Sequence, residues 1–173
     1  GTCFDVKANN VTLNCNRRLI NYSTAELPNK WGVRVNGYND TTIFNCRIRN
    51  EQDVGMNDEG IYISYANNTK IINNTMTIFG MSDAILLSDV SNSLIANNTI
   101  RAMDKDGVDI QGAGTNNIIL SNEINCSSSS CSGIRIDAAS NKIFNNFITT
   151  YNASSSVGIT LSSASNNTVY DNT

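Results

Sequence analysis

An asparagine-containing phrase recurs at a nearly constant interval along the 173-residue chain, and this interval limits the folds that the chain can adopt. The phrase reads "IINNT", "IANNT", "LSNEI", "FNNFI" and "YDNT", and its asparagines are spaced by 24, 24, 24 and 26 residues: Asn74, Asn98, Asn122, Asn146 and Asn172. A second phrase, a small residue followed by apolar-x-apolar residues, keeps the same step and begins at Gly32, Gly60, Ala84, Gly107, Gly133 and Gly158. A fixed period of this length is the signature of a stacked repeat.

Each repeat contains two or three short β-rich segments without helical periodicity, and the chain has one proline, Pro28. This pattern predicts an all-β fold, a parallel β-solenoid of about seven coils of about 24 residues, whose equivalent residues stack about 4.8 Å apart. The alternative, a twisted β-sandwich, would show hairpin turns without a constant period. We expect two aliphatic columns to fill the interior: Ile43, Ile71, Ile95, Ile119, Ile143 and Val169, and Val35, Ile63, Leu87, Ile110, Ile136 and Leu161.

The recurring asparagine needs its own explanation, because asparagine is a poor strand residue. At a bend between two strands it can take the left-handed backbone conformation. Its amide can also bond to the amides above and below, as in stacked cross-β structures. We therefore expect an asparagine ladder at one bend of the solenoid.

The repeat G-I-x-I, a polar stretch, then N-x-x-I-x-N-N-x-I resembles the right-handed parallel β-helix repeat of pectate-lyase-like proteins, NosD-like periplasmic proteins and many archaeal and bacterial surface proteins. The opening "TCFDVKANNVTLNCN" is similar to the first coil of the surface-protein members. The resemblance covers nearly the whole chain and implies a right-handed single-stranded β-helix. We expect residues 1–173 to form one domain, and the absence of capping segments suggests either a fragment of a longer chain or a filament subunit. It says little about activity, because this scaffold hosts enzymes, adhesins and inert fibres.

The composition favours an extracellular or cell-surface location. The net charge is −3, and charged residues are few beside abundant asparagine, serine and threonine, so we expect no nucleic-acid partner. No stretch approaches the roughly 18 apolar residues of a membrane span.

Five cysteines agree with this location. Cys126 and Cys131 bracket "SSSS" and can close a small disulfide ring between the fifth and sixth coils. Cys15 and Cys46 are expected near the bend of adjacent coils, within disulfide distance. The alternative pairs Cys3 with Cys15 and leaves Cys46 as a buried thiol.

Several N-x-S/T sequences are glycosylation candidates. Asn73 and Asn97 belong to the asparagine pairs, so we expect them to be shielded. The candidates with room for a glycan are those expected in the variable connections: Asn21, Asn39, Asn125 and Asn152.

The chain has no histidine, which removes the Ser-His-Asp and Cys-His catalytic arrangements and the usual zinc and copper sites. Carboxylates remain, and one strand face is predicted to carry a candidate carbohydrate or cation site: Asp83, Asp106, Asp109, Arg135 and Asp137. In pectate-lyase-like enzymes this face often holds the sugar polymer. The likeness of "KDGVDI" to the N-T-D-G-I-D stretch of polygalacturonases is incomplete, because the G-H-G motif is missing.

The same residues suggest a calcium site. "DKDGVD" places Asp104, Asp106 and Asp109 in a short acidic loop, and Glu59, Asp83 and Asp106 are expected to stack on neighbouring coils. A hard cation with oxygen ligands would relieve the repulsion between stacked carboxylates. No other cofactor is expected.

Both ends of the predicted solenoid look like ordinary repeats, without a capping helix. A terminal coil leaves apolar side chains and a strand edge uncovered, so we expect copies of the chain to stack head to tail into filaments. The sequence therefore favours a non-catalytic structural or adhesive β-solenoid. The alternative is a polysaccharide-binding or polysaccharide-cleaving protein, of the lyase or glycosidase kind.

Overall fold

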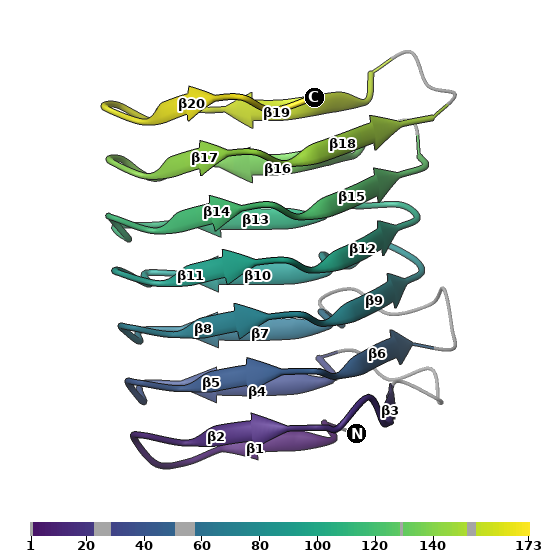
Figure 1. Ribbon diagram of the computed structural model, residues 1–173, viewed down its shortest axis with the longest axis vertical. Coiled ribbons are helices and arrows are strands. Elements are labelled where there is room, and N and C mark those ends of the chain that lie inside the picture. The colour runs from purple at the N-terminus through teal and green to yellow at the C-terminus, as the bar shows by residue number, and fades with distance from the viewer. Residues whose placement is uncertain (1, 23–28, 51–57, 129, 152–154) are drawn as a thin grey trace.

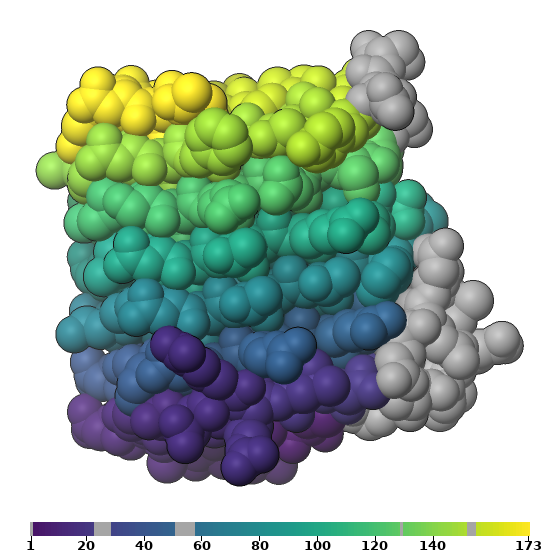
Figure 2. Space-filling model, turned by 45° about the vertical axis from the view of Figure 1, so that its right-hand side comes forward, coloured from purple at the N-terminus to yellow at the C-terminus, as the bar shows by residue number. Residues whose placement is uncertain are grey.

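The computed structural model describes residues 2–22, 29–50, 58–128, 130–151 and 155–173, and these form a parallel β-solenoid (Figure 1). Six coils of three strands are followed by a seventh coil of two strands. The coils stack in chain order, from purple at the N-terminus to yellow at the C-terminus (Figure 2). The prediction of an all-β solenoid of about seven coils is confirmed.

Equivalent strands of successive coils pair in parallel and build three sheets. Sheet A contains β1 (Phe4–Val6), β4 (Val33–Asn36), β7 (Ile61–Ser64), β10 (Ile85–Ser88), β13 (Val108–Gln111), β16 (Ser132–Ile136) and β19 (Val157–Leu161). Sheet B contains β2 (Thr12–Asn14), β5 (Thr42–Phe44), β8 (Lys70–Ile72), β11 (Leu94–Ala96), β14 (Ile118–Leu120), β17 (Lys142–Phe144) and β20 (Thr168–Tyr170). Sheet C contains β3 (Leu19–Tyr22), β6 (Arg47–Asn50), β9 (Thr75–Ile78), β12 (Thr99–Ala102), β15 (Glu123–Cys126) and β18 (Phe147–Thr150).

Both predicted aliphatic columns run through the interior in register. Ile71, for example, pairs with Ile43 and Ile95 in sheet B, and Leu87 pairs with Ile63 and Ile110 in sheet A. All six of these side chains are fully buried. The core is therefore one continuous stack, in which every coil buries its apolar face against the next.

The glycine at the start of several sheet A strands is required by the closeness of the next coil. A Cβ added at Gly60 would lie 2.6 Å from the carbonyl oxygen of Ala84, and one added at Gly107 would lie 2.6 Å from that of Gly133. The recurring phrase therefore marks a contact between backbones.

The asparagine ladder is confirmed at the bend between sheets B and C. The Asn98 amide nitrogen donates to Oδ1 of Asn122 at 2.9 Å and to the Ile71 carbonyl at 2.9 Å. Oδ1 of Asn98 accepts bonds from the backbone and side-chain nitrogens of Asn74. The same pattern continues through Asn146 to Asn172. Each buried amide is thus satisfied by the coils on either side.

The expectation that one asparagine takes both roles at the bend is wrong. The first residue of the pair has the left-handed backbone, with φ of 55° at both Asn73 and Asn97, while the second forms the ladder. Asn73 and Asn97 are consequently exposed, and the prediction that they are shielded is also wrong. Their side chains point outward because the ladder residue that follows each of them points inward.

A second ladder, which the sequence analysis did not predict, precedes sheet B. Oδ1 of Asn117 accepts a bond from the backbone nitrogen of Ser93 at 3.0 Å, and Oδ1 of Asn141 accepts one from Asn117 at 2.9 Å. Buried side-chain oxygens therefore fix the register of neighbouring coils both before and after each of these sheet B strands.

Two disulfides are present. Cys15 and Cys46 join the first two coils with their Cα atoms 4.7 Å apart, and Cys126 and Cys131 close the predicted small ring. Cys3 is an exposed free thiol, so the alternative pairing of Cys3 with Cys15 is wrong. The stacking of adjacent coils brings Cys15 and Cys46 together, whereas Cys3 lies beside the carbonyl of Asn21 at 3.3 Å.

Apolar side chains are exposed on the first and last coils that the structure describes, including Phe4, Leu161 and Val169. Head-to-tail stacking through these surfaces stays a prediction. Over the described ranges, no helix has the length and hydropathy needed to cross a membrane.

Replacing Asn98 by Ala should lower the free energy of unfolding by about 1–3 kcal/mol, because the backbone groups that it satisfies stay buried without partners. Replacing its neighbour Asn97 by Gly is the matched control, since Gly accepts a positive φ and the Asn97 side chain is exposed. Urea denaturation measures both. Equal effects at the two positions would contradict the buried role of Asn98.

Candidate functional site

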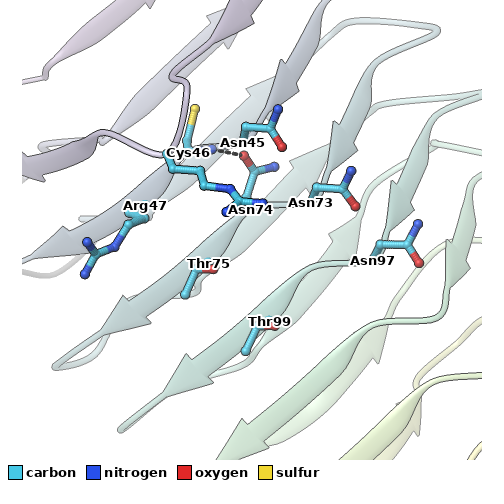
Figure 3. Close-up of a pocket in the computed structure, with 9 residues that line it drawn as sticks. Asn45, Cys46, Arg47, Asn73, Asn74, Thr75, Asn97 and Thr99 are labelled. Atoms are coloured by element: carbon cyan, nitrogen blue, oxygen red, sulfur yellow. Dashed lines mark hydrogen bonds between the residues drawn. The ribbon is translucent and has the colours of Figure 1, made fainter.

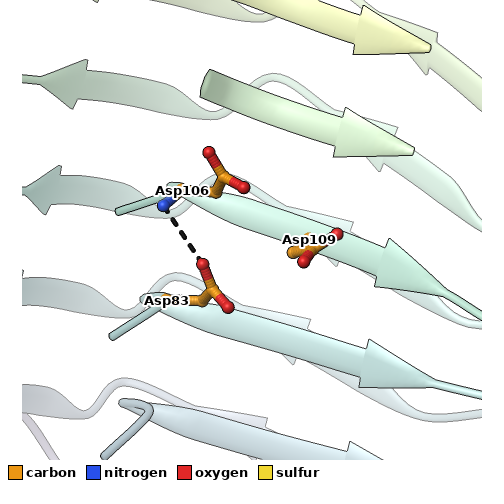
Figure 4. Close-up of side chains that lie close together, drawn as sticks. All are labelled: Asp83, Asp106 and Asp109. Atoms are coloured by element: carbon orange, nitrogen blue, oxygen red, sulfur yellow. Dashed lines mark hydrogen bonds between the residues drawn. The ribbon is translucent and has the colours of Figure 1, made fainter. Parts of the chain in front are cut away.

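Three carboxylates gather on the outer face of sheet A, from Asp83, Asp106 and Asp109 (Figure 4). Asp83 and Asp106 occupy the same position in neighbouring coils, just before the small residue that leads into the strand. The backbone nitrogen of Ala84 donates to the carbonyl of Asp106, which fixes this register. Asp109 lies on β13, where strand alternation points it away from the core residues Val108 and Ile110.

The cluster is compact and buried. One oxygen atom from each carboxylate lies within 4.8 Å of the others, and Asp83, Asp106 and Asp109 are 0%, 4% and 1% exposed. Two of the three carboxylates accept a hydrogen bond from the backbone of the next coil. The backbone nitrogen of Asp106 donates to Oδ1 of Asp83 at 3.1 Å, and that of Ser132 donates to Oδ1 of Asp106 at 2.6 Å. These carboxylates therefore extend the coil-to-coil bonding seen in the asparagine ladders.

Lys105 supplies a positive charge at the edge of the cluster, with Nζ 2.9 Å from Oδ2 of Asp83. Gln111 donates from Nε2 to Oδ2 of Asp109. Oδ1 of Asp109 is buried, and within the described part of the chain it has no hydrogen-bond partner. An unsatisfied buried carboxylate oxygen is costly, so the cluster has spare capacity for a proton or a cation.

Burial and nearby negative charge shift the proton affinity of these groups. Burial, with the charges of Asp83 and Asp106 adding to it, raises the pKa of Asp109 to about 7, against the opposing effects of Gln111 and Arg135. Burial also raises the pKa of Asp83, although Lys105 opposes that shift. Asp109 can therefore carry a proton close to neutral pH.

An aromatic pair lies on the same face, one and two coils below Asp83. The rings of Trp31 and Tyr62 stack with centroids 5.5 Å apart, and the Trp31 indole nitrogen donates to Oε2 of Glu59 at 2.7 Å. Glu59 is buried, and burial raises its pKa. These three side chains, with Asn29 and Leu86, line a cavity of about 210 Å³.

The structure brings together part of the predicted site. Asp83, Asp106 and Asp109 converge, and Arg135 is the register partner of Asp109 on the next strand. Asp137 instead bonds to the Arg135 guanidinium, with Oδ2 2.8 Å from Nη2.

Asp104 does not join the cluster. It is exposed and accepts a bond from the backbone nitrogen of Gly80, so the acidic set is completed by Asp83 on the neighbouring coil. The predicted grouping of Asp104 with Asp106 and Asp109 is therefore not the one that forms: Asp83 takes the place of Asp104, which bonds to the backbone of Gly80. Metal binding itself stays a prediction. The expected stacking of Glu59, Asp83 and Asp106 is confirmed by the register: the backbone nitrogen of Gly60, which follows Glu59, donates to the Asp83 carbonyl, and that of Ala84, which follows Asp83, donates to the Asp106 carbonyl.

The sequence analysis missed Trp31, Tyr62 and Lys105. Trp31 precedes Gly32 and so occupies the column that contains Glu59, which was a usable signal. Tyr62 occupies the outward column of Asp109, two coils earlier. Lys105 lies within "DKDGVD", where the aspartates alone suggested a site.

The glycosylation candidates lie in different settings. Asn21 is on β3 and Asn125 is on β15, so their expected placement in variable connections is wrong. Asn39 lies between β4 and β5, and its Oδ1 accepts a bond from the backbone of Asn67 at 2.8 Å. Asn152 is outside the described residues. Glycosylation itself stays a prediction at all four.

Comparison with known proteins gives one match. A family model described as the right-handed beta helix region matches residues 5–173. No curated protein and no solved structure matches the chain. The match extends over every coil, including the carboxylate cluster.

The free energy of unfolding of the wild type should fall as the pH rises from about 4 to about 7. Asp109 has an ordinary pKa of 3.8 and a folded-state pKa of about 7, so in this range only the folded chain keeps the proton. The fall should be on the order of 2–4 kcal/mol. Asp109→Asn should flatten the profile, which urea denaturation in chelator-containing buffer measures.

Asp104→Asn is the matched control, because Asp104 is exposed and lies outside the cluster. It should follow the wild-type profile. Parallel profiles for the wild type and Asp109→Asn would show that Asp109 does not hold a proton in the folded state.

Proposed function

Because the chain belongs to the right-handed β-helix family, we propose that it is a non-catalytic adhesive module that binds an uncharged polysaccharide along the outer face of sheet A. The polymer would lie across the coils, over the aromatic pair of Trp31 and Tyr62 and toward the carboxylate cluster. The coil-to-coil spacing of about 4.8 Å gives a regular series of contacts along such a ligand.

The observation that carries this proposal is the cavity of about 210 Å³ beside the cluster. Trp31, Tyr62 and Leu86 supply apolar surface for the C–H faces of sugar rings, and the exposed Asn29 supplies polar atoms for hydroxyl groups. Glu59 holds the Trp31 indole in place through its hydrogen bond. The site is thus fixed in shape before a ligand arrives.

An uncharged sugar fits better than an acidic one, because carboxylates outnumber the cations near the cavity; the cations are Lys105 and Arg34, whose guanidinium lies 4.9 Å from the centroid of the Trp31 ring. Asp83, Asp106 and Glu59 are all within this face, and Lys105 is already paired with Asp83. An anionic sugar would meet repulsion as well as the cost of losing its water.

Binding is favoured over cleavage by the burial of the carboxylates. A general acid or nucleophile must reach the glycosidic bond, and the two carboxyl groups must stand on opposite sides of it. Asp83 and Asp109 are almost fully buried, and Asp83 and Asp106 are engaged with backbone nitrogens of the next coil. Their contacts support a positioning role.

An extracellular location agrees with this proposal. Two disulfides are compatible with a secreted or surface-displayed protein, since disulfides persist in oxidising compartments. Polysaccharides are abundant in the same setting.

Replacing Trp31 by Ala should weaken polysaccharide binding about tenfold, the loss expected for one aromatic contact. Affinity electrophoresis in gels that contain soluble β-glucan, xylan or galactan measures the retardation of the wild type and the variant. Thermal melts show whether both chains remain folded.

The matched control is Phe147→Ala, because Phe147 is an exposed aromatic on sheet C, away from the cavity. It should be retarded like the wild type. Failure of all three neutral polysaccharides to retard the wild type, or equal losses in the two variants, would contradict the proposal. Release of reducing sugar by the wild type would replace binding with cleavage.

Calcium is a second candidate ligand of the cluster, favoured by the unpartnered Oδ1 of Asp109 among the described residues. Carboxylate oxygens are the donors that Ca²⁺ prefers, although Lys105 already neutralises part of the charge. Calcium at 100 times its dissociation constant should stabilise the wild type by about 2.7 kcal/mol. Asp106→Asn should lose this increase in melting temperature, and an unchanged wild-type melt would exclude the site.

A further inference from the structure

A groove follows the bend between sheets B and C, in a part of the molecule separate from the carboxylate cluster. It consists of two adjoining cavities, of about 480 Å³ and about 320 Å³, which share Arg47 and Thr75 in their walls. The first follows the bend itself, and the second extends over the outer face of sheet C. Together they span the first four coils, from Arg17 to Arg101.

The asparagine pairs account for the polar wall of this groove. The left-handed first residue of each pair turns its amide outward, while the second stays in the buried ladder. Figure 3 shows the outward amides of Asn45, Asn73 and Asn97 in a row on successive coils, beside the hydroxyls of Thr75 and Thr99. The groove therefore presents a repeating set of hydrogen-bond donors and acceptors.

Positive charge is concentrated in the same groove. Four arginines line it: Arg17, Arg47, Arg49 and Arg101. All four are exposed, and no carboxylate is among the residues that line either cavity. In the part of the chain that the structure describes, none of these guanidinium groups forms an ion pair. A protein of net charge −3 thus has a local positive surface.

The strand register sets the spacing of these charges. Arg49 and Arg101 occupy one outward column of sheet C, with Thr77 between them, so their Cα atoms are separated by two strand spacings, about 10 Å. Arg47 lies two residues before Arg49 on β6, also pointing outward. The Arg49 guanidinium lies over the Phe79 ring, 5.6 Å from its centroid, which restrains it.

We infer that this groove is a second binding site, for an acidic polysaccharide that carries carboxylate or sulfate groups. The guanidinium groups pair with the anionic groups, and the asparagine amides and threonine hydroxyls bond to the sugar hydroxyls. The polymer runs along the solenoid axis, since that is the direction in which the donors repeat. Glu123, which follows Thr99 in the same column, limits the site on the C-terminal side.

The composition of the groove favours a polysaccharide over other polyanions. Nucleic-acid binding to single strands relies on aromatic faces on which bases stack, and the aromatic side chain in the groove, Phe79, is covered by Arg49. A membrane surface would contact protruding side chains, whereas the amides of Asn45, Asn73 and Asn97 line a concave corner.

The two proposed sites take ligands of opposite character. The sheet A site has buried carboxylates and an aromatic cavity, and the groove has exposed guanidinium groups. The groove can therefore be tested without reference to sheet A, and Trp31→Ala should leave acidic polysaccharide binding unchanged.

The test is titration calorimetry of the full chain with polygalacturonate, which carries carboxylates, and with heparin, which carries sulfates. Fully methyl-esterified polygalacturonate is the uncharged comparison. We expect binding to at least one acidic polymer, in the wild type and in Trp31→Ala alike, and this binding should weaken as salt is raised. Any binding of the uncharged ester belongs to the sheet A site, so Trp31→Ala should weaken it and the loss of Arg47 and Arg49 should not. The sample must carry no glycan at Asn73 or Asn97, which mass spectrometry verifies, because a glycan there would occupy the groove.

The double variant Arg47→Gln/Arg49→Gln should lose at least tenfold in affinity. Its matched control is Lys70→Gln/Lys142→Gln, which removes the same charge from exposed residues of sheet B that do not line the groove. Circular dichroism melts check folding of both. Equal weakening in the two double variants would show that the affinity depends only on the net charge of the chain, and this would overturn the site. Absence of binding to both acidic polymers, or tighter binding to single-stranded DNA or phosphatidylserine vesicles, would overturn it as well.

Discussion

Hydrogen bonds between coils are the constraint on which the rest of this structure depends. A coil of about 24 residues has no core of its own, so its strands and bends are stable only when the neighbouring coils supply their partners. Backbone pairing provides this within the three sheets, and side chains provide it where the strands end. Asn98 illustrates the second case, since its amide bonds to Asn122 on one side and accepts from Asn74 on the other. Asp83 and Asp106 do the same with carboxylates on sheet A. Structure and candidate site therefore share one bonding pattern.

The exact register also determines which surface residues become neighbours. Because every outward position repeats at the strand spacing, each outward side chain has neighbours at the same position of the adjacent coils. On sheet A this places Asp109 beside Arg135 and near Asp83, in a buried and mainly acidic setting. On sheet C it aligns Arg49 with Arg101 across Thr77. One scaffold thus carries two chemically opposite faces. The family supplies the scaffold, and the outward side chains distinguish one member from another.

The sequence predicted the interior positions, which the repeat period determines. It did not predict the contacts of outward side chains, which the period does not constrain. The aliphatic columns and the ladder at Asn74 to Asn172 were accessible, because a wrong residue there would break the core. The sequence did not show which asparagine of each pair takes the left-handed backbone and which forms the ladder. Both members are asparagine in "INNT" and "ANNT", and only the backbone conformation distinguishes them. The contact of Trp31 with Tyr62 and the groove around Arg47 depend on outward side chains, which the core does not constrain. The alternative that paired Cys3 with Cys15 was wrong because the number of residues between two cysteines does not tell whether their side chains meet in the stack.

The disulfide between Cys15 and Cys46 has a mechanical consequence. A solenoid pulled by its N-terminal end would peel one coil at a time, since each coil is held chiefly by the next. Tension that reaches Cys15 passes through the disulfide directly to Cys46, which is 31 residues further along the chain. The intervening segment, with β3, β4 and β5, is then shielded from the load and adds no length to the extended chain. Unfolding under tension would have to continue beyond Cys46. Reduction of the disulfide would allow the segment between Cys15 and Cys46 to extend as well. The covalent link therefore bears the force and protects the part of the first two coils that lies between Cys15 and Cys46.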